Sequence, residues 1–269
     1  MKVLGVRTLT VVLSTSLLAS CAIGGSSPVS AEQIREKFVS AGGTCTTPVK
    51  SDLSTTSSEA RKESSSASYV VLESHSCGEG EGGFDRFETE ADALKSSLFL
   101  EGIFFGFRKQ IGLEDDGNPD AQILVGEWRI TVTEADSSRV DSLAAKLNGT
   151  VYDFADPRTR SKVLRDITKD DPLVALKEVS KGCLADEALS TDGRSVSFDT
   201  EGEDDSDGDL VSSVFCTLRV LGAPDYVFDK IVTTRALDGR TEETWDKFAA
   251  NWSYHPDSGL RLTVIGESN

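Results

Sequence analysis

The fold class of this 269-residue chain is decided near its end, by residues 248–264, which read FAANWSYHPDSGLRLTV. Apolar and polar residues alternate on both sides of residues 256–259, whose Pro-Asp-Ser-Gly sequence is typical of a turn. Because a period of two places the apolar side chains of a strand on one face, this segment predicts an antiparallel hairpin with one buried face.

Helical patterns occur in other parts of the chain. The clearest begins at Asp136 or Ser137 and has apolar residues at i, i+3, i+4 and i+7, which are Val140, Leu143, Ala144 and Leu147. Further helices are expected from a cap at Ser30 to Ser40, over residues 90–98, and after Pro224. Helices and antiparallel strands mix without the regular spacing of βαβ units, so the predicted class is α+β.

More strands are expected over residues 69–76, around Phe84 and Phe87, and over residues 210–220. Between residues 123 and 132 the apolar side chains change from odd to even positions. That change of phase predicts a β-bulge at Gly126 and Glu127.

The cysteines divide the chain into two similar halves. There are five, an odd number for an exported protein, and Cys21 has a separate role that is described below. The other four are Cys45 and Cys77, 32 positions apart, and Cys183 and Cys216, 33 positions apart. The first of each pair follows a helical pattern, and the second lies in or just after a strand-like run. Four cysteines allow three pairings, and this similarity favours Cys45–Cys77 with Cys183–Cys216, each joining a helix end to a strand.

We therefore expect two tandem helix-on-antiparallel-sheet units, derived from one duplication and each holding one disulfide. The first unit covers residues 31–154 and the second covers residues 172–269. Between them, residues 155–171 carry five basic and four acidic side chains and are expected to form a linker, which can be helical.

The N-terminus has the pattern of an export signal. Lys2 and Arg7 precede an apolar stretch over residues 8–18, which is too short to span a bilayer, so residues 1–20 predict a signal peptide. The sequence Leu18-Ala19-Ser20-Cys21 resembles the lipobox of bacterial lipoproteins. This resemblance implies that Cys21 becomes the lipid-modified N-terminus, carrying a fatty acid such as palmitate, and that residues 21–30 are the tether. The chain would then be anchored on the extracytoplasmic face of the cell membrane.

The body also resembles uncharacterised lipoproteins of high-GC Gram-positive bacteria. The likeness lies in residues 237–239 (Leu-Asp-Gly), residues 252–257 (Trp-Ser-Tyr-His-Pro-Asp) and the repeated helix–Cys and strand–Cys pattern. A weaker likeness is to tandem-repeat periplasmic inhibitors and outer-membrane assembly lipoproteins, in which helices pack on an antiparallel sheet that binds protein partners. These resemblances imply a type of fold and supply no site residues.

Charge excludes one class of function. The chain has 45 acidic and 28 basic side chains, a formal net charge of −17. A protein that binds nucleic acid neutralises phosphates with clustered Lys and Arg, so this balance argues against such a partner.

Candidate catalytic and metal-binding residues are few. His255 lies beside Asp257 on the expected hairpin turn, His75 lies near Cys77, and no nucleophile elbow or phosphate-binding loop is present in the sequence. Residues 199–209 hold seven acids, and Glu203, Asp205 and Asp207 match the first ligands of an EF-hand. The twelfth position, which requires Glu, is Val214.

The most unusual segment is the apolar run of residues 98–107, which contains four Phe. It is either core or an exposed surface for a ligand, a partner or the membrane, and the sequence leaves both readings open. The leading hypothesis is a lipid-anchored, non-catalytic envelope protein without a cofactor or metal, which binds a protein or another envelope component. The alternatives are an envelope enzyme that uses His255 and Asp257, and a calcium-responsive module built on the acidic loop.

Overall fold

The computed structural model describes residues 29–46, 48–50, 69, 71–78, 82–110, 121–133, 137–154, 156–203 and 208–267. Within these ranges the chain forms seven α-helices and two antiparallel sheets, which confirms the α+β class. None of the helices in these ranges is long and apolar enough to cross a membrane. The signal peptide, Cys21 and most of the tether lie outside the described residues.

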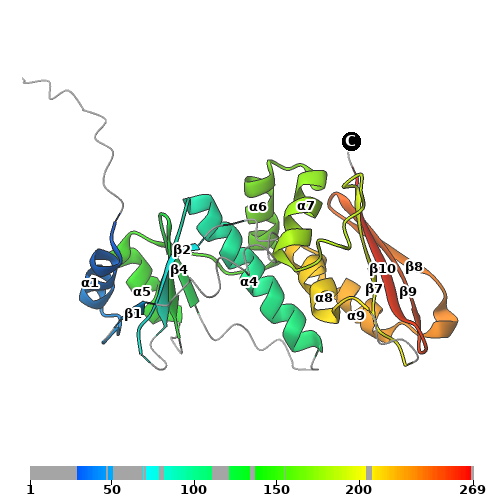
Figure 1. Ribbon diagram of the computed structural model, residues 1–269, viewed down its shortest axis with the longest axis horizontal. Coiled ribbons are helices and arrows are strands. Elements are labelled where there is room, and N and C mark those ends of the chain that lie inside the picture. Colours follow the sequence, from blue (N-terminus) through cyan, green and yellow to red (C-terminus); the bar gives the residue numbers. More distant parts are fainter. Residues whose placement is uncertain are drawn as a thin grey trace, which may run out of the picture.

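The first sheet, sheet A, is covered by helices on both faces. Its strand order is β1-β2-β3-β5-β4-β6. The strands are β1 (Val49–Lys50), β2 (Val71–Ser76), β3 (Gly83–Phe87), β4 (Ala121–Val125), β5 (Trp128–Val132) and β6 (Thr150–Val151). Helices α1 (Ala31–Ala41) and α5 (Ser137–Leu147) pack on one face, and α4 (Glu90–Gln110) packs against β3, β4 and β5 from the other (Figure 1).

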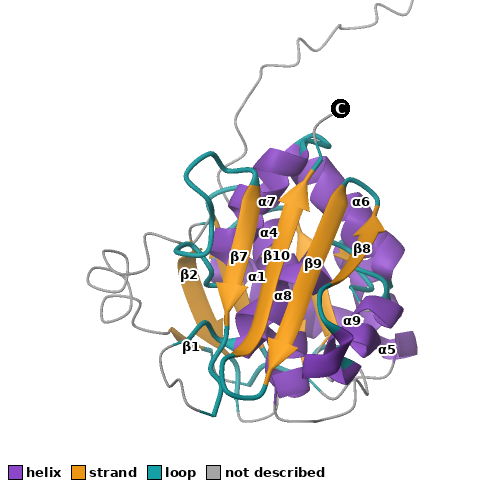
Figure 2. Ribbon diagram, turned by 90° about the vertical axis from the view of Figure 1, so that its right-hand side faces the viewer, coloured by secondary structure: helices purple, strands orange, loops and turns teal. Residues whose placement is uncertain are grey.

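The second sheet, sheet B, has one covered face and one open face. Its order is β7-β10-β9-β8, with β7 (Ser195–Asp199), β8 (Thr241–Trp245), β9 (Phe248–His255) and β10 (Gly259–Gly266). The covering helices are α6 (Pro157–Thr168), α7 (Pro172–Gly182), α8 (Val211–Val220) and α9 (Asp225–Thr233), and a short 3-10 turn, η1 (Ala236–Asp238), precedes β8. Figure 2 shows the other face of sheet B, which no helix covers.

Helix α4 joins the two units. In Figure 1 the layers follow one another as α1 and α5, sheet A, the remaining helices, and sheet B. Although α4 belongs in sequence to the first unit, its Leu98, Phe99 and Phe105 are buried in the large core that also holds Trp252 and Val264 of sheet B. The two sheets are therefore held together by one shared helix layer.

The strands of the two sheets are connected in a similar order. In sheet A, β3 is followed by α4 and the hairpin β4–β5; in sheet B, β7 is followed by α8, α9 and the three antiparallel strands β8, β9 and β10. The last strand of each series lies beside the first strand, giving β3-β5-β4 and β7-β10-β9. This common order agrees with the expected tandem arrangement. Both expected disulfides, Cys45–Cys77 and Cys183–Cys216, are present.

One of these disulfides joins different elements from those expected. Residues 210–220 were expected to form a strand, but residues Val211–Val220 form α8, so Cys183–Cys216 connects two helices. Eight consecutive residues of α8 are buried, from Ser213 to Val220. A helix that is buried on all sides lacks the amphipathic pattern by which helices are recognised in a sequence. A short apolar segment of this kind cannot be distinguished from a buried strand by the spacing of its apolar residues.

Several local predictions are confirmed. Ser30 caps α1, Gly42 ends that helix with φ of 106°, and α5 covers Ser137–Leu147. The terminal hairpin is β9–β10, in which Trp252 pairs with Leu262.

Other predictions were wrong or too short. Gly126 and Glu127 form the turn of a hairpin and not a β-bulge, because Val125 pairs directly with Trp128 and the change of phase marks the reversal of the chain. The helix expected over residues 90–98 continues to Gln110. The segment expected as a linker, which was allowed to be helical, holds α6, and its Val163 and Leu164 are buried in the shared core.

Two glycines let α4 and α8 approach closely. A Cβ atom at Gly102 would lie 2.9 Å from Sγ of Cys216, and one at Gly106 would overlap the backbone carbonyl oxygen of Ser212. Substituting Gly106 by Ala would gain about 1 kcal/mol of helix propensity but overpack a backbone contact at a cost of about 3 kcal/mol.

We therefore expect Gly106→Ala to lower the free energy of unfolding by about 2 kcal/mol, measured by urea denaturation. Phe107→Ala, on the exposed side of the same helix, is the control and should change stability by about 0.5 kcal/mol or less. An unchanged or higher stability for Gly106→Ala would contradict the close α4–α8 contact.

Candidate binding surface

The apolar run of residues 98–107 is divided between two faces of α4. Leu98, Phe99 and Phe105 point into the shared core and are almost completely buried. Phe105 meets Phe228 of α9 edge to face, with ring centroids 5.1 Å apart. Half of the phenylalanines in the run are therefore core residues.

The opposite face of α4 packs on sheet A in its first half only. There Ala93 lies in a small cluster with Phe87 and Leu124, and Ser96 accepts a 2.8 Å hydrogen bond from Arg129 of β5. Beyond this contact, α4 extends away from sheet A (Figure 1). The same face of the helix then continues without the sheet beneath it.

Four apolar side chains occupy this continuation, and we call them the α4 stripe: Leu100, Ile103, Phe104 and Phe107. Phe104 is 45% exposed and Phe107 is 54% exposed, while Leu100 and Ile103 are half-buried and Ile103 also packs at the edge of the shared core. The spacing i, i+3, i+4, i+7 places all four on one side of the helix.

Two exposed leucines lie at the same end of the helix layer. Leu184 is 61% exposed and Leu210 is 56% exposed, and Ser213 connects them by hydrogen bonds to both of their carbonyl oxygens. Ser212 packs against Gly106 of α4. Phe104 and Phe107 together expose roughly 200 Å² of apolar surface, at about 100 Å² each, and the two leucines expose a similar area beside α7 and α8.

The open face of sheet B has a different character. Its central row consists of Ser197, Thr263, Asn251 and Glu242. Asp199 pairs with Arg261, Arg240 donates to Asn251, and these groups line a shallow depression of about 480 Å³. Ile265 is the one large apolar side chain among the described outward residues of this face. A polar face of this kind is normal for a solvated antiparallel sheet.

The two histidines lie on opposite sheets and do not form a common site. His75 is in β2 of sheet A, with Nε2 3.3 Å from Oε2 of Glu73. His255 is at the end of β9, where its Nδ1 accepts a 3.3 Å hydrogen bond from the backbone N–H of Asp257. Both the His255 and Asp257 side chains are more than half exposed, so this is a contact within a surface turn.

The acidic loop is engaged in local contacts. Both carboxylate oxygens of Asp199 accept from Arg261, and Asp209 accepts from the backbone N–H of Asp199. Val214, at the twelfth position of the EF-hand pattern, is buried in α8. Asp205 and Asp207 lie outside the described residues, and in the described part of the chain no three acidic, His or Cys groups are placed to hold a metal.

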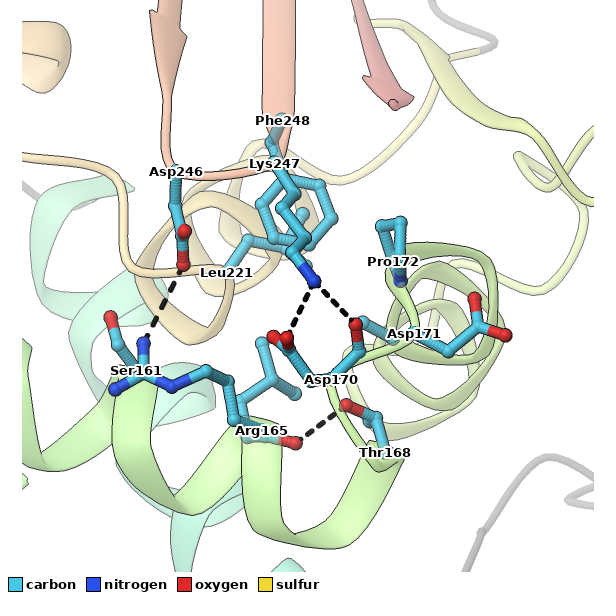
Figure 3. A pocket seen from close by; sticks show the side chains of 12 residues that line it. Ser161, Arg165, Thr168, Asp170, Asp171, Pro172, Leu221, Asp246, Lys247 and Phe248 are labelled. Atoms are coloured by element: carbon cyan, nitrogen blue, oxygen red, sulfur yellow. Dashed lines mark hydrogen bonds and ion pairs between the residues drawn. The ribbon is translucent and has the colours of Figure 1, made fainter. Parts of the chain in front are cut away.

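A small pocket lies where the β8–β9 turn meets α6 and α7 (Figure 3). Lys247 contacts the Asp170 carboxylate at 2.6 Å, and Arg165 lies 3.6 Å from Asp246. The pocket volume is about 20 Å³, which is room for one water molecule. These ion pairs therefore fasten the β8–β9 turn to α6 and to the start of α7.

Among the described residues, the carboxyl groups with a lowered pKa are far apart in the chain. Hydrogen bonds from Arg35, Ser190 and Arg235 lower the pKa of Glu32, Asp192 and Asp238, respectively. Each is a contact between residues two or three positions apart on the surface. Such pairs stabilise turns and helix ends, whereas a catalytic site brings perturbed groups together from distant segments.

Comparison of the chain with protein-family models, with curated proteins and with solved structures finds no match in any of the three. The sequence singled out the apolar run but gave no sign of Leu184 and Leu210, which are isolated in sequence and lie exposed at the end of α7 and the start of α8. The intervals of three, one and three residues between positions 100, 103, 104 and 107 were the sequence pattern from which the stripe could have been predicted.

Proposed function

We propose that this chain is an exported, lipid-anchored, non-catalytic protein of the cell envelope that binds a protein partner through the α4 stripe. The observation that carries the proposal is the exposure of Phe104 and Phe107 on a helix fixed by its packing on α8. Covering about 100 Å² of each ring would contribute roughly 2.5 kcal/mol, so a partner that fits this surface gains substantial affinity.

The proposed anchor is supported by the Leu18–Cys21 motif and by the short connection to the body. The eight residues 21–28 precede Val29, where the described body begins, and they reach at most about 28 Å when extended. A lipid on Cys21 would therefore keep the α1 end of the body close to the bilayer surface.

Replacing Cys21 by Ser should abolish incorporation of labelled palmitate into the protein in growing cells. The wild-type chain should be labelled, because the motif makes Cys21 the acceptor of the lipid. Labelling of Cys21→Ser at the wild-type level would refute the anchor.

The binding surface is tested by in-cell crosslinking followed by mass spectrometry. We expect one dominant captured partner, and we expect Phe104→Ser combined with Phe107→Ser to reduce its yield at least tenfold, because hot-spot residues each contribute about 2 kcal/mol. Phe105 is unsuitable for this purpose because it is 2% exposed and packs in the core.

Leu237→Ser is the matched control, since Leu237 is 95% exposed but lies on η1, outside the stripe. Its capture should equal that of the wild type, and all variants should retain the wild-type melting temperature. Equal capture by the wild type and the Phe104/Phe107 variant would reject the stripe as the binding surface.

A further inference from the structure

A row of cations lies on the outer side of α6, in a chain whose formal net charge is −17. We call it the α6 row, and its members are Arg158, Lys162, Arg165 and the C-cap residue Lys169. All four side chains are exposed, and their intervals of four, three and four residues place them on one side of the helix. The side chains that α6 buries are on the opposite side: Arg160, Val163, Leu164 and Thr168. The row therefore faces away from the shared core.

Acidic neighbours balance only part of this row. Lys162 is 2.6 Å from Asp166, and Arg165 is 3.6 Å from Asp246 (Figure 3). Exposed ion pairs of this kind are weak. The other two members of the row form no ion pair with a described residue. The remaining carboxylates near the ends of α6 cap a helix or contact Lys247, and they are Asp156, Asp170 and Asp171.

The row has the chemistry of a surface that meets phospholipid head groups. Within α6, every residue of which the structure describes, no large apolar side chain is exposed. Protein interfaces have an apolar core, whereas Lys and Arg side chains alone attract an anionic lipid surface. We infer that the α6 row contacts anionic phospholipid head groups of the membrane that holds the chain, an inference that rests on the proposed lipid at Cys21.

The connection between the lipid and the body permits this contact. Residues 21–28 reach at most about 28 Å. Val29 is fixed to the body, because its carbonyl oxygen accepts a 3.1 Å hydrogen bond from Nε1 of the buried Trp128. In Figure 1 the chain enters α1 on the same side of the long axis as the turn between α6 and α7, and α4 ends on the opposite side. A bilayer beside the α6–α7 turn therefore leaves the α4 stripe open to a protein partner.

The acidic remainder of the chain does not prevent this contact. At physiological salt the Debye length is about 8 Å, so carboxylates farther than this from the head groups are largely screened. Each cation at the contact adds to the affinity for an anionic bilayer. The lipid anchor also raises the local concentration of the body at the surface, so that a contact too weak to hold a free protein becomes occupied.

The test is photo-crosslinking of the lipidated protein, purified from cells and reconstituted in two kinds of vesicle. One kind contains phosphatidylcholine alone, and the other contains about 30% of the anionic lipid phosphatidylglycerol. The crosslinking amino acid replaces Thr159, a neutral neighbour of Arg158, or Ser253 on the open face of sheet B. We expect roughly tenfold or more phospholipid adduct at position 159 in the anionic vesicles than in the neutral ones, and little adduct at position 253 in either.

A pair of substitutions tests the row itself. Arg158→Gln with Lys169→Gln should reduce the phospholipid adduct at position 159 about fivefold or more, because it removes two of the four cations. Neither residue is in a described ion pair, so the melting temperature should stay at the wild-type value. Arg240→Gln with Arg261→Gln is the matched control, since it makes the same change of net charge in the depression of sheet B. It should leave the adduct at the wild-type level.

Flotation of the vesicles separates this inference from the proposed anchor. If the protein does not float with either kind of vesicle, the anchor and the inference are both rejected. If it floats but gives no phospholipid adduct at position 159, or the same yield in both lipid compositions or in the glutamine variant, the contact is rejected and the anchor stands. A protein adduct in place of a phospholipid adduct at position 159 in living cells would assign the row to an acidic protein partner and would also overturn the inference.

Discussion

Replacing Cys183 and Cys216 together by Ala is expected to lower the free energy of unfolding by roughly 3–4 kcal/mol. The bond closes a loop of 33 residues and joins the end of α7 to α8. Without it, the unfolded chain gains the conformational freedom of that loop. The buried sulfur of Cys216 also packs beside Gly102, so its removal weakens the contact that holds α4.

The measurement is urea denaturation of the oxidised proteins, with a drop of about 10 °C in melting temperature as the second readout. The Cys45→Ala and Cys77→Ala pair is the matched comparison, because its loop of 32 residues has nearly the same chain entropy. The two variants should therefore lose similar stability, with the larger loss at Cys183–Cys216. A loss below about 1 kcal/mol at that pair would contradict its place in the shared core.

The second large effect is expected at the buried pair formed by Glu101 of α4 and Arg219 of α8. Oε1 of Glu101 lies 3.4 Å from Nη2 of Arg219, and both side chains are almost fully buried. The guanidinium also lies over the ring of Phe105, 4.2 Å from its centre. Arg219 also lies 3.9 Å from the exposed carboxylate of Asp225. Glu101→Gln removes the buried one of these two countercharges and should cost about 3 kcal/mol.

A double substitution separates the pair from its packing. Glu101→Leu with Arg219→Leu removes both charges and should be less destabilising than Glu101→Leu alone, as denaturation of the three proteins will show. Glu242→Gln, on the open face of sheet B, is the control and should be nearly neutral. If Glu101→Gln were also neutral, the pair would not position α4 or the stripe next to it.

Local signals predicted much of the fold. The hairpin at residues 248–264 has both alternation and a turn sequence, and Ser30 and Gly42 mark the ends of α1 by their capping chemistry. The cysteine spacing predicted both disulfides, because similar contexts at similar distances select one of three pairings. These features depend on residues that are near one another in sequence.

The features that escaped prediction depend on tertiary contacts. The expected strand over residues 210–220 is a helix because burial on all sides hides its period, and the end of α4 beyond residue 98 depends on the fit of Gly102 and Gly106 against α8. Whether the apolar run was core or surface was open in the sequence. It is both, because sheet A covers only the first half of that face of α4.

A photo-crosslinking amino acid placed at position 107 in one protein and at position 242 in another distinguishes a partner on the α4 stripe from one on the open face of sheet B. Both side chains are exposed, one on α4 and one on β8. We predict a single discrete adduct from position 107 in living cells and none from position 242. An adduct from position 242 alone, or none from either position, would contradict the assignment of the stripe as the binding surface.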